Sequence, residues 1–346
     1  MKAKRTLALM LVAFVMLSVA FAGCSAPSQS SAQESEKQES VTVGEETGSD
    51  KLTVGFSLYF RKDQFWKDLE SVAVAKAEAN GIELICQDAD TDSEKQVQQL
   101  ETFVAQKVDA IILAPVDPEA PISVIAEAAE AGIPVFTIDT NITDVSNLTS
   151  EISHDHYEGA YQLGQKAADF LEENYGGKGK VAIITDPTNI PLRNRTQGFK
   201  DALTERLGDN VEFVAELNGK CDRDVSSNCA ESVITPYPDT TIWFGTTPDM
   251  GFGIIATLET KGIDPNTVAV YSEGWGEETV IALTKDNPYL KTVMVSPADS
   301  LADLGLQAII DYLGGKSVEK KTFIPTDIVD ASNAVDYFKK YGVELE

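Results

Sequence analysis

From residue 51 onward, short apolar runs alternate with longer segments in which apolar residues recur every three or four positions. The short runs predict strands at 52–58, 82–88, 109–115, 133–139, 180–185, 211–217, 241–245 and 268–274. The longer segments predict helices at 65–81, 93–107, 118–131, 191–207, 248–261 and from 224 onward. Strands that are apolar throughout and alternate with helices indicate parallel sheet covered on both faces. We therefore expect an α/β fold of doubly wound parallel sheets.

Polar side chains gather where the predicted strands end. Segments such as "SLYFRKDQFW", "IDTN", "TDPTNIPLRNR", "GTTPD" and "SEGW" carry aromatics, carboxylates, amides and hydroxyls, whereas the strands carry almost none. Open doubly wound sheets bind ligands beyond the carboxyl ends of their strands. The sequence therefore places its binding site among these segments.

The motifs of several enzyme classes are missing. No G-x-G-x-x-G follows the first strand, and there is no P-loop or G-x-S-x-G elbow, so we expect neither a nucleotide cofactor nor a catalytic nucleophile. The two histidines, His154 and His156, have no evident third ligand, and we expect no metal site. We expect a binding protein without cofactors rather than an enzyme.

The net charge of the chain argues against a nucleic-acid partner. The 346 residues carry 28 Lys and Arg against 55 Asp and Glu, a formal net charge of −27. Nucleic-acid binding rests on clustered basic residues, so we expect no nucleic-acid partner.

The N-terminus has the pattern of an export signal. Lys2, Lys4 and Arg5 precede an apolar run over 7–22. The alternative interpretation is a transmembrane anchor, but the run is short for a membrane span. "FAGC" at 21–24 resembles the lipobox of bacterial lipoproteins, which implies cleavage after residue 23 and lipidation of Cys24. Residues 24–50 are nearly devoid of apolar side chains and are interpreted as a disordered tether. The protein would be exported and held by lipid at the outer face of the cell membrane.

Two further cysteines, Cys221 and Cys229, lie eight positions apart. In an exported protein this spacing suggests a disulfide between a loop and the helix that follows, with two free thiols as the alternative.

Four segments together resemble one known family. "DAIILAPVDP", "AGIPVFTIDT", "RNRTQGFKDAL" and "TPDMGFGIIATLETKG" are similar to class I periplasmic sugar-binding proteins of ABC transporters, the ribose-binding group in particular, over about 51–330. The resemblance implies two similar lobes joined by a three-segment hinge, with crossings near 153–155, 295–297 and 324–326. The lobes would be 51–153 with 297–324, and 154–296 with 325–346.

The resemblance also implies a set of ligand contacts in the cleft between the lobes. Phe65 and Trp66 would stack on the two faces of a sugar ring, while Arg193 would reach across the cleft toward the ligand and Asp139 or Glu273. Arg195 would pair with a carboxylate of its own lobe. The complete set of expected contacts is Tyr59, Asp63, Phe65, Trp66, Asp139, His154, Arg193, Thr247, Glu273, Trp275 and Ser296.

The function expected from this resemblance is that of a monomeric, lipid-tethered receptor that delivers a sugar or polyol to the permease subunits of an ABC importer. Three alternatives stay open at this point: a receptor for an autoinducer-like or nucleoside solute, a sensor subunit that presents its closed form to a kinase, and an exported enzyme.

Overall fold

The computed structural model describes residues 51–285 and 287–342. The signal peptide expected at 1–23, the tether at 24–50 and the lipidated Cys24 lie outside these residues. None of the helices within the described residues is long and apolar enough to cross a membrane.

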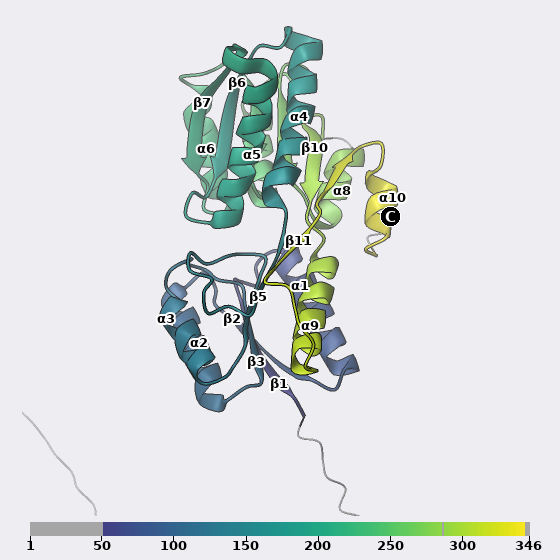
Figure 1. Ribbon diagram of the computed structural model, residues 1–346. Coiled ribbons are helices and arrows are strands. Elements are labelled where there is room, and N and C mark those ends of the chain that lie inside the picture. The colour runs from purple at the N-terminus through teal and green to yellow at the C-terminus, as the bar shows by residue number, and fades with distance from the viewer. Residues whose placement is uncertain (1–50, 286, 343–346) are drawn as a thin grey trace, which may run out of the picture. The chain divides into compact units, whose positions relative to one another are not determined.

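The N-terminal lobe is built on a six-stranded sheet in which all strands run parallel. Its order is β11 (Lys321–Ile324), β5 (Ser150–His154), β4 (Val135–Ile138), β3 (Ala110–Leu113), β1 (Thr53–Leu58), β2 (Glu83–Asp88). One face is covered by α1 (Gln64–Ala79) and α9 (Ala298–Leu313), the other by α2 (Ser93–Gln106) and α3 (Ile122–Glu130) (Figure 1). Strands β1, β3 and β4 are buried almost throughout, as a sheet covered on both faces requires.

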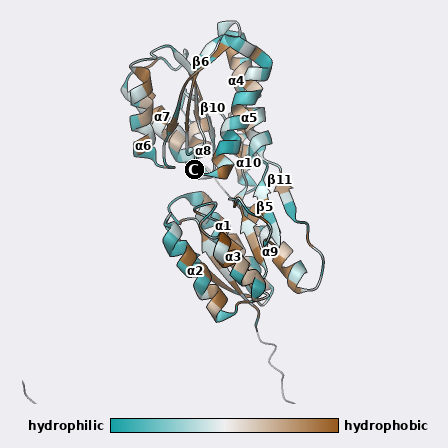
Figure 2. Ribbon diagram, turned by 60° about the vertical axis from the view of Figure 1, so that its left-hand side comes forward, coloured by the Kyte–Doolittle hydropathy of each residue, from teal (hydrophilic) through white to brown (hydrophobic). Residues whose placement is uncertain are grey.

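The C-terminal lobe repeats this plan. Its order is β12 (Asp327–Asp330), β10 (Leu290–Val295), β9 (Ala269–Glu273), β8 (Thr240–Gly245), β6 (Gly179–Thr185), β7 (Val211–Asn218). One face carries α4 (His156–Tyr175) and α5 (Ile190–Leu207); the other carries α6 (Arg223–Ile234), α7 (Pro248–Thr260) and α8 (Gly276–Thr284), with α10 (Ala334–Lys339) packed on α8. The fold class of two similar doubly wound α/β lobes is confirmed. In both lobes apolar residues colour the strands and the inner stripes of the helices (Figure 2).

One strand departs from the all-parallel expectation, because β12 runs antiparallel to β10. The chain leaves the first sheet at the carboxyl end of β11 and enters the second as β12 after residues 325–326. If the carboxyl edges of the two sheets face each other, a chain that leaves the first sheet at this edge enters the second sheet at its carboxyl edge. Its strand in the second sheet must then be antiparallel to the neighbouring strand. The antiparallel strand thus indicates that the carboxyl edges of the two sheets face one another.

The chain passes between the sheets at 155, at 296–297 and at 325–326. Each passage directly follows a strand that ends at this shared edge: β5, β10 or β11. The crossing regions therefore lie beside the segments in which the sequence placed its binding site.

Helices α4 and α5 approach each other closely at Gly198. A Cβ at this position would overlap the carbonyl oxygen of Tyr157 and lie 3.0 Å from the backbone nitrogen of Tyr161. The absence of a side chain is what lets the two helix backbones meet, and this contact lies one turn from Arg195 on α5 and directly beside His156 on α4.

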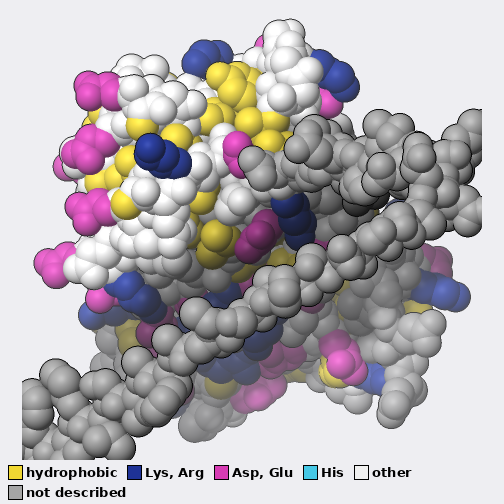
Figure 3. All heavy atoms as spheres, turned by 90° about the horizontal axis from the view of Figure 1, so that it is seen from below, with side chains coloured by type: hydrophobic (Ala, Val, Ile, Leu, Met, Phe, Trp, Pro, Cys, Tyr) yellow, Lys and Arg dark blue, Asp and Glu magenta, His cyan; other side chains and the backbone are white. Residues whose placement is uncertain are grey.

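The surface carries both signs of charge. On the face seen from below the view of Figure 1, acidic and basic side chains of the described residues are interspersed among uncharged ones (Figure 3).

Candidate functional site

A cavity of about 1010 Å³ opens between the carboxyl edges of the two sheets. The segments after β1 and β4 contribute one wall, and those after β6, β7, β8 and β9 contribute the other. Small-molecule pockets typically measure ~300–1,000 Å³, so this cavity is ample for a monosaccharide. Of the expected contacts, those that line it are Tyr59, Asp63, Phe65, Trp66, Asp139, Thr247, Glu273 and Trp275.

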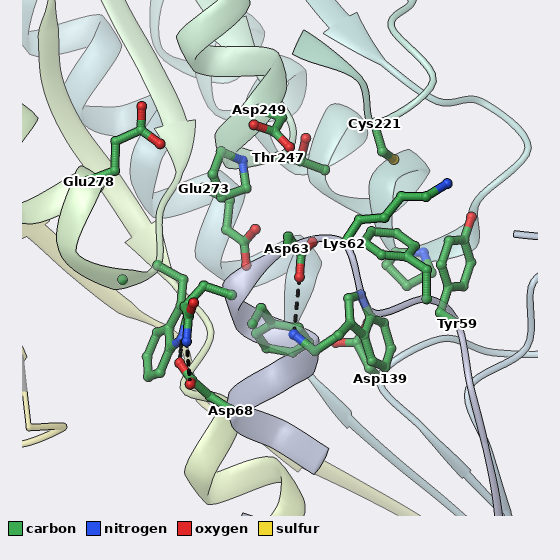
Figure 4. A pocket seen from close by; sticks show the side chains of 18 of the residues that line it. Tyr59, Lys62, Asp63, Asp68, Asp139, Cys221, Thr247, Asp249, Glu273 and Glu278 are labelled. Carbon is green, nitrogen blue, oxygen red and sulfur yellow. Dashed lines mark hydrogen bonds between the residues drawn. The ribbon is translucent and has the colours of Figure 1, made fainter. Parts of the chain in front are cut away.

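The segment after β1 forms an aromatic wall. Asp63 caps α1, where its carboxylate accepts a hydrogen bond from the backbone nitrogen of Trp66 at 3.0 Å (Figure 4). Tyr59 stacks on Trp66 with centroids 5.9 Å apart, whereas the rings of Phe65 and Trp66 are perpendicular at 5.3 Å. Two rings that sandwich a sugar would be parallel with the sugar between them, so the expected sandwich of Phe65 and Trp66 is wrong for this arrangement.

Of the two arginines near the start of α5, Arg195 lines the cavity and Arg193 does not. Arg195 is buried on α5, where its guanidinium donates to Glu273 Oε1 at 3.2 Å and to the Thr246 carbonyl oxygen at 2.8 Å. A second contact of 3.2 Å joins Nη1 to Glu273 Oε2, so the pair is bidentate. Arg193 is exposed and donates to the carbonyl oxygens of Pro187 and Thr188 in its own loop. The expectation that Arg193 reaches across the cleft is wrong, whereas Arg195 does pair with a carboxylate of its own lobe.

Glu273 neutralises the buried charge of Arg195. Burial raises the pKa of Glu273, with the guanidinium of Arg195 opposing the shift.

Asp139 sits in a strained turn directly after β4. Its φ is +62°, and the backbone nitrogen of Thr140 donates to the carbonyl oxygen of Ile138 at 2.7 Å, closing a γ-turn around it. A non-glycine residue held in this region costs free energy and marks a constrained position. The turn holds the Asp139 side chain, only 7% exposed, at the cavity wall.

Two histidines lie next to the Asp139 carboxylate. His156 Nε2 lies 3.7 Å and His154 Nδ1 3.9 Å from Asp139 Oδ1. Burial alone would raise the pKa of Asp139, but these histidines and Arg195 together hold it below its usual value. Burial, followed by the charge of Arg195, lowers the pKa of His156 well below its usual value, so its ring is neutral at pH 7.

The structure supplies the third metal-ligand candidate that the sequence did not reveal, because Asp139, His154 and His156 offer ligand atoms within 4.8 Å of one another. However, His156 Nδ1 accepts a hydrogen bond from Arg195 Nε at 3.2 Å. The proton of the neutral ring is then on Nε2, facing Asp139, and this nitrogen has no lone pair for a metal. The arrangement favours a chain of polar contacts from Arg195 through His156 to Asp139.

Trp275 links the two lobes at the rim of the cavity. Its indole nitrogen donates to Asp68 Oδ2 on α1 at 2.8 Å, while its ring packs edge-on against Tyr341 (Figure 4). Trp275 is 7% exposed, so its contribution to the cavity wall is small. Thr247 caps α7, where its hydroxyl oxygen accepts a hydrogen bond from the backbone nitrogen of Met250 at 3.4 Å.

Two other expected contacts are placed outside the cavity. Ser296 is fully buried at a crossing. His154 is also buried and lines a second hollow, of about 590 Å³, together with His156. Neither residue lines the large cavity, so their expected roles as ligand contacts are not supported by their positions.

The three cysteines within the described residues are not paired. Cys86, Cys221 and Cys229 are free, so the expected disulfide is absent. Cys221 lies in the loop after β7 at φ +49° and lines the cavity, whereas the thiol of Cys229, on α6, lies 3.6 Å from the Asn218 carbonyl oxygen. The two thiols therefore lie in different surroundings.

Asp63 provides a pH-dependent prediction. Burial, together with the charges of Glu273, Asp249 and Asp139, raises its pKa to about 7. Because the folded-state pKa is raised, the contribution of Asp63 to stability is fully present below pH ~4 and is lost as the pH rises through ~7. In Asp63→Asn the amide still caps α1, and we expect its stability relative to wild type to increase by about 2 kcal/mol between pH 5 and 8.

Thermal unfolding of both proteins over this pH range would measure the difference. Asp92→Asn is the matched control, because Asp92 caps α2 in the same way but is exposed. A difference for Asp63→Asn that stays constant with pH would contradict the prediction.

Comparison with known proteins gives consistent matches. A family model described as "Periplasmic binding protein domain" matches residues 54–317. The ribose import binding protein of Bacillus subtilis is 26% identical over 80% of this chain and 86% of its own length. The galactofuranose-binding protein of Escherichia coli is 29% identical over 85% and 84%. A crystal structure of an ABC transporter solute-binding protein from Mycobacterium smegmatis with bound glycerol has a TM-score of 0.75 at 26% identity, covering 82% of this chain and 95% of its own.

Proposed function

The chain belongs to the periplasmic binding protein family, and on that premise we propose that it is the solute receptor of an ABC importer for a sugar or sugar-like ligand. The observation that carries the proposal is the cavity between the lobes, whose polar groups come from both. The family consists of solute-binding proteins, and relatives of this chain bear the names of ribose-, fructose- and galactofuranose-binding proteins.

The groups in the cavity suit a hydroxylated ligand. The buried ion pair of Arg195 and Glu273 lines the cavity, and the carboxylates of Asp139 and Asp63 accept hydrogen bonds from hydroxyls. Bonds to ionised groups are roughly twice as strong as neutral ones. The aromatic wall formed by Tyr59, Phe65 and Trp66 offers apolar contact to the C–H groups of a sugar ring.

Because Asp139 belongs to one lobe and Arg195 to the other, a ligand that touches both stabilises the arrangement in which both reach it. Permease subunits that bind this arrangement would distinguish loaded from empty receptor. This coupling is what an import receptor requires.

The test is a thermal-shift and calorimetric screen of the purified protein, freed of any co-purified molecule, against neutral and aminated sugars, polyols and nucleosides. We expect at least one sugar or polyol to raise the melting temperature and bind with a one-to-one stoichiometry. Stabilisation by nucleosides alone, or turnover of a bound sugar, would contradict the proposal.

We also propose that Cys24 is lipidated and that residues 24–50 tether a monomeric receptor to the outer face of the cell membrane. The support is the apolar run at 7–22 followed by "FAGC". Mass spectrometry of the cellular protein tests this: a diacylglyceryl group on Cys24 is expected, and Cys24→Ser should be recovered from the medium or periplasm rather than from membranes.

A further inference from the structure

We propose that the ligand carries a positively charged amino group, so that the receptor takes an aminated sugar or polyol in preference to a neutral one. This inference rests on the function proposed above, and it names the chemical class of the ligand.

The cavity wall has a large excess of negative charge. Eight carboxylate side chains line it, against three cationic ones, Lys62, Arg195 and Arg223. Each cation is already paired: Arg195 with Glu273, Arg223 with Asp249 and Glu278, and Lys62 with Asp90 outside the cavity. The remaining carboxylates, Asp63 and Asp139 among them, form no ion pair with any of these three cations.

Asp139 is the sharpest case. Its Oδ1 is buried and accepts no hydrogen bond from the described residues, although the side chain lines the cavity. The two nearby histidine nitrogens lie at 3.7 and 3.9 Å, beyond hydrogen-bond distance. Oδ1 thus faces the histidines, but the carboxylate also lines the cavity, where a charged donor on the ligand would pair with a largely buried anion, which is strongly favoured.

Asp63 and Glu273 extend toward one another from the two lobes (Figure 4). Mutual repulsion with Glu273 and Asp139 contributes to the raised pKa of Asp63, although burial contributes more. A bound ammonium group would replace this repulsion by attraction, which a neutral hydroxyl cannot do.

The aromatic wall is compatible with a cation. Phe65 and Tyr59 are only half-buried and line the cavity next to Asp63. An ammonium group near an aromatic face is attracted by its negative potential. Carboxylates and aromatic faces on one wall are together suited to a protonated amine on an otherwise hydroxylated ring.

The experiment compares ligands that differ only in replacement of a hydroxyl by an amine. Calorimetry would measure D-glucosamine against D-glucose, D-galactosamine against D-galactose, and an amino-inositol against myo-inositol, at low salt and about pH 7, where the amines are still mostly protonated and about half of Asp63 is ionised. N-acetylglucosamine and N-acetylgalactosamine keep the nitrogen but lose the charge. We expect at least one amine to bind about tenfold or more tightly than both its hydroxyl and its acetylated counterparts, with an advantage that decreases with added salt.

Variants of the cavity carboxylates test which side chains cause the preference for an amine. Asp63→Asn and Asp139→Asn each keep side-chain size and are expected to reduce the amine's advantage to about threefold or less, whereas Asp209→Asn removes an exposed charge that does not line the cavity and should leave it unchanged. Binding of neutral sugars with equal or higher affinity than their amines would overturn the inference and leave the proposed function intact. An amine preference that survives in both variants would also overturn it. Failure of every sugar and polyol to bind would refute the inference together with the proposed function.

Discussion

Arg195→Lys is expected to weaken binding of the best sugar or polyol ligand about 100-fold, or ~2.7 kcal/mol. Lysine retains the charge beside Glu273 but cannot reproduce the bidentate contact or the simultaneous bonds to the Thr246 carbonyl oxygen and His156. Calorimetric titration of wild type and variant with the same ligand measures the loss.

Arg195→Ala is expected to have a second effect, on stability. It leaves Glu273 buried without a cationic partner, which typically costs ~3–5 kcal/mol. The unliganded variant should therefore melt well below wild type, whereas Arg195→Lys should stay close to it.

Arg193→Ala is the matched control, two residues away on the same helix. Its exposed guanidinium contacts carbonyl oxygens of its own loop, so we expect affinity within about threefold of wild type. Loss of binding in Arg193→Ala with retention in Arg195→Lys would show that the cavity assignment is wrong.

Gly198→Ala is expected to destabilise the unliganded protein by about 3 kcal/mol, although alanine is the better helix former. The new Cβ would overlap the Tyr157 carbonyl oxygen, a backbone atom that moves only if α4 moves. Moving α4 also displaces His156, its first residue, from Arg195, so ligand affinity should decrease as well.

Chemical denaturation and calorimetry measure the two effects. Gln197→Ala is the control, because this neighbouring side chain is exposed and bonds only to Asp201 on the same helix. Its cost should not exceed ~0.5 kcal/mol. Wild-type stability in Gly198→Ala would mean that α4 and α5 are not held as close as described.

The sequence was sufficient for the architecture, because strand burial and helix periodicity both follow from apolar spacing. The location of the site followed as well, since the residues after β1, β4, β8 and β9 are polar where their strands are apolar. The antiparallel β12 was not predicted, because its four residues have no distinctive pattern and its direction is set by the passage from β11.

The choice between the two arginines could have been made from helical phase. Arg195 is three residues after Leu192 and four before Phe199, both buried, whereas Arg193 is four before the exposed Gln197. The family resemblance placed the arginine contact at Arg193, on the exposed side of the helix. The orientation of Phe65 against Trp66, in contrast, depends on rotamers and packing that no spacing encodes.

The cysteine pair and the histidine cluster show two further limits. A disulfide depends on the relative directions of two side chains, which an eight-residue separation does not define. Asp139 reaches His154 and His156 only because β4 and β5 are neighbours in the sheet and the turn after β4 is sharply bent. Both are properties of three-dimensional pairing.

The three short crossings limit how the halves of this receptor can move. Each consists of one or two residues outside regular structure, and two of them contain a proline, Pro297 and Pro325, whose ring fixes φ. Three such short crossings resist sliding or separation of the two lobes, so we expect the lobes to move by a bend or twist about one common axis. We therefore expect the two lobes to open about one axis, so that widening the mouth of the cavity also changes the separation of the lobes' outer surfaces.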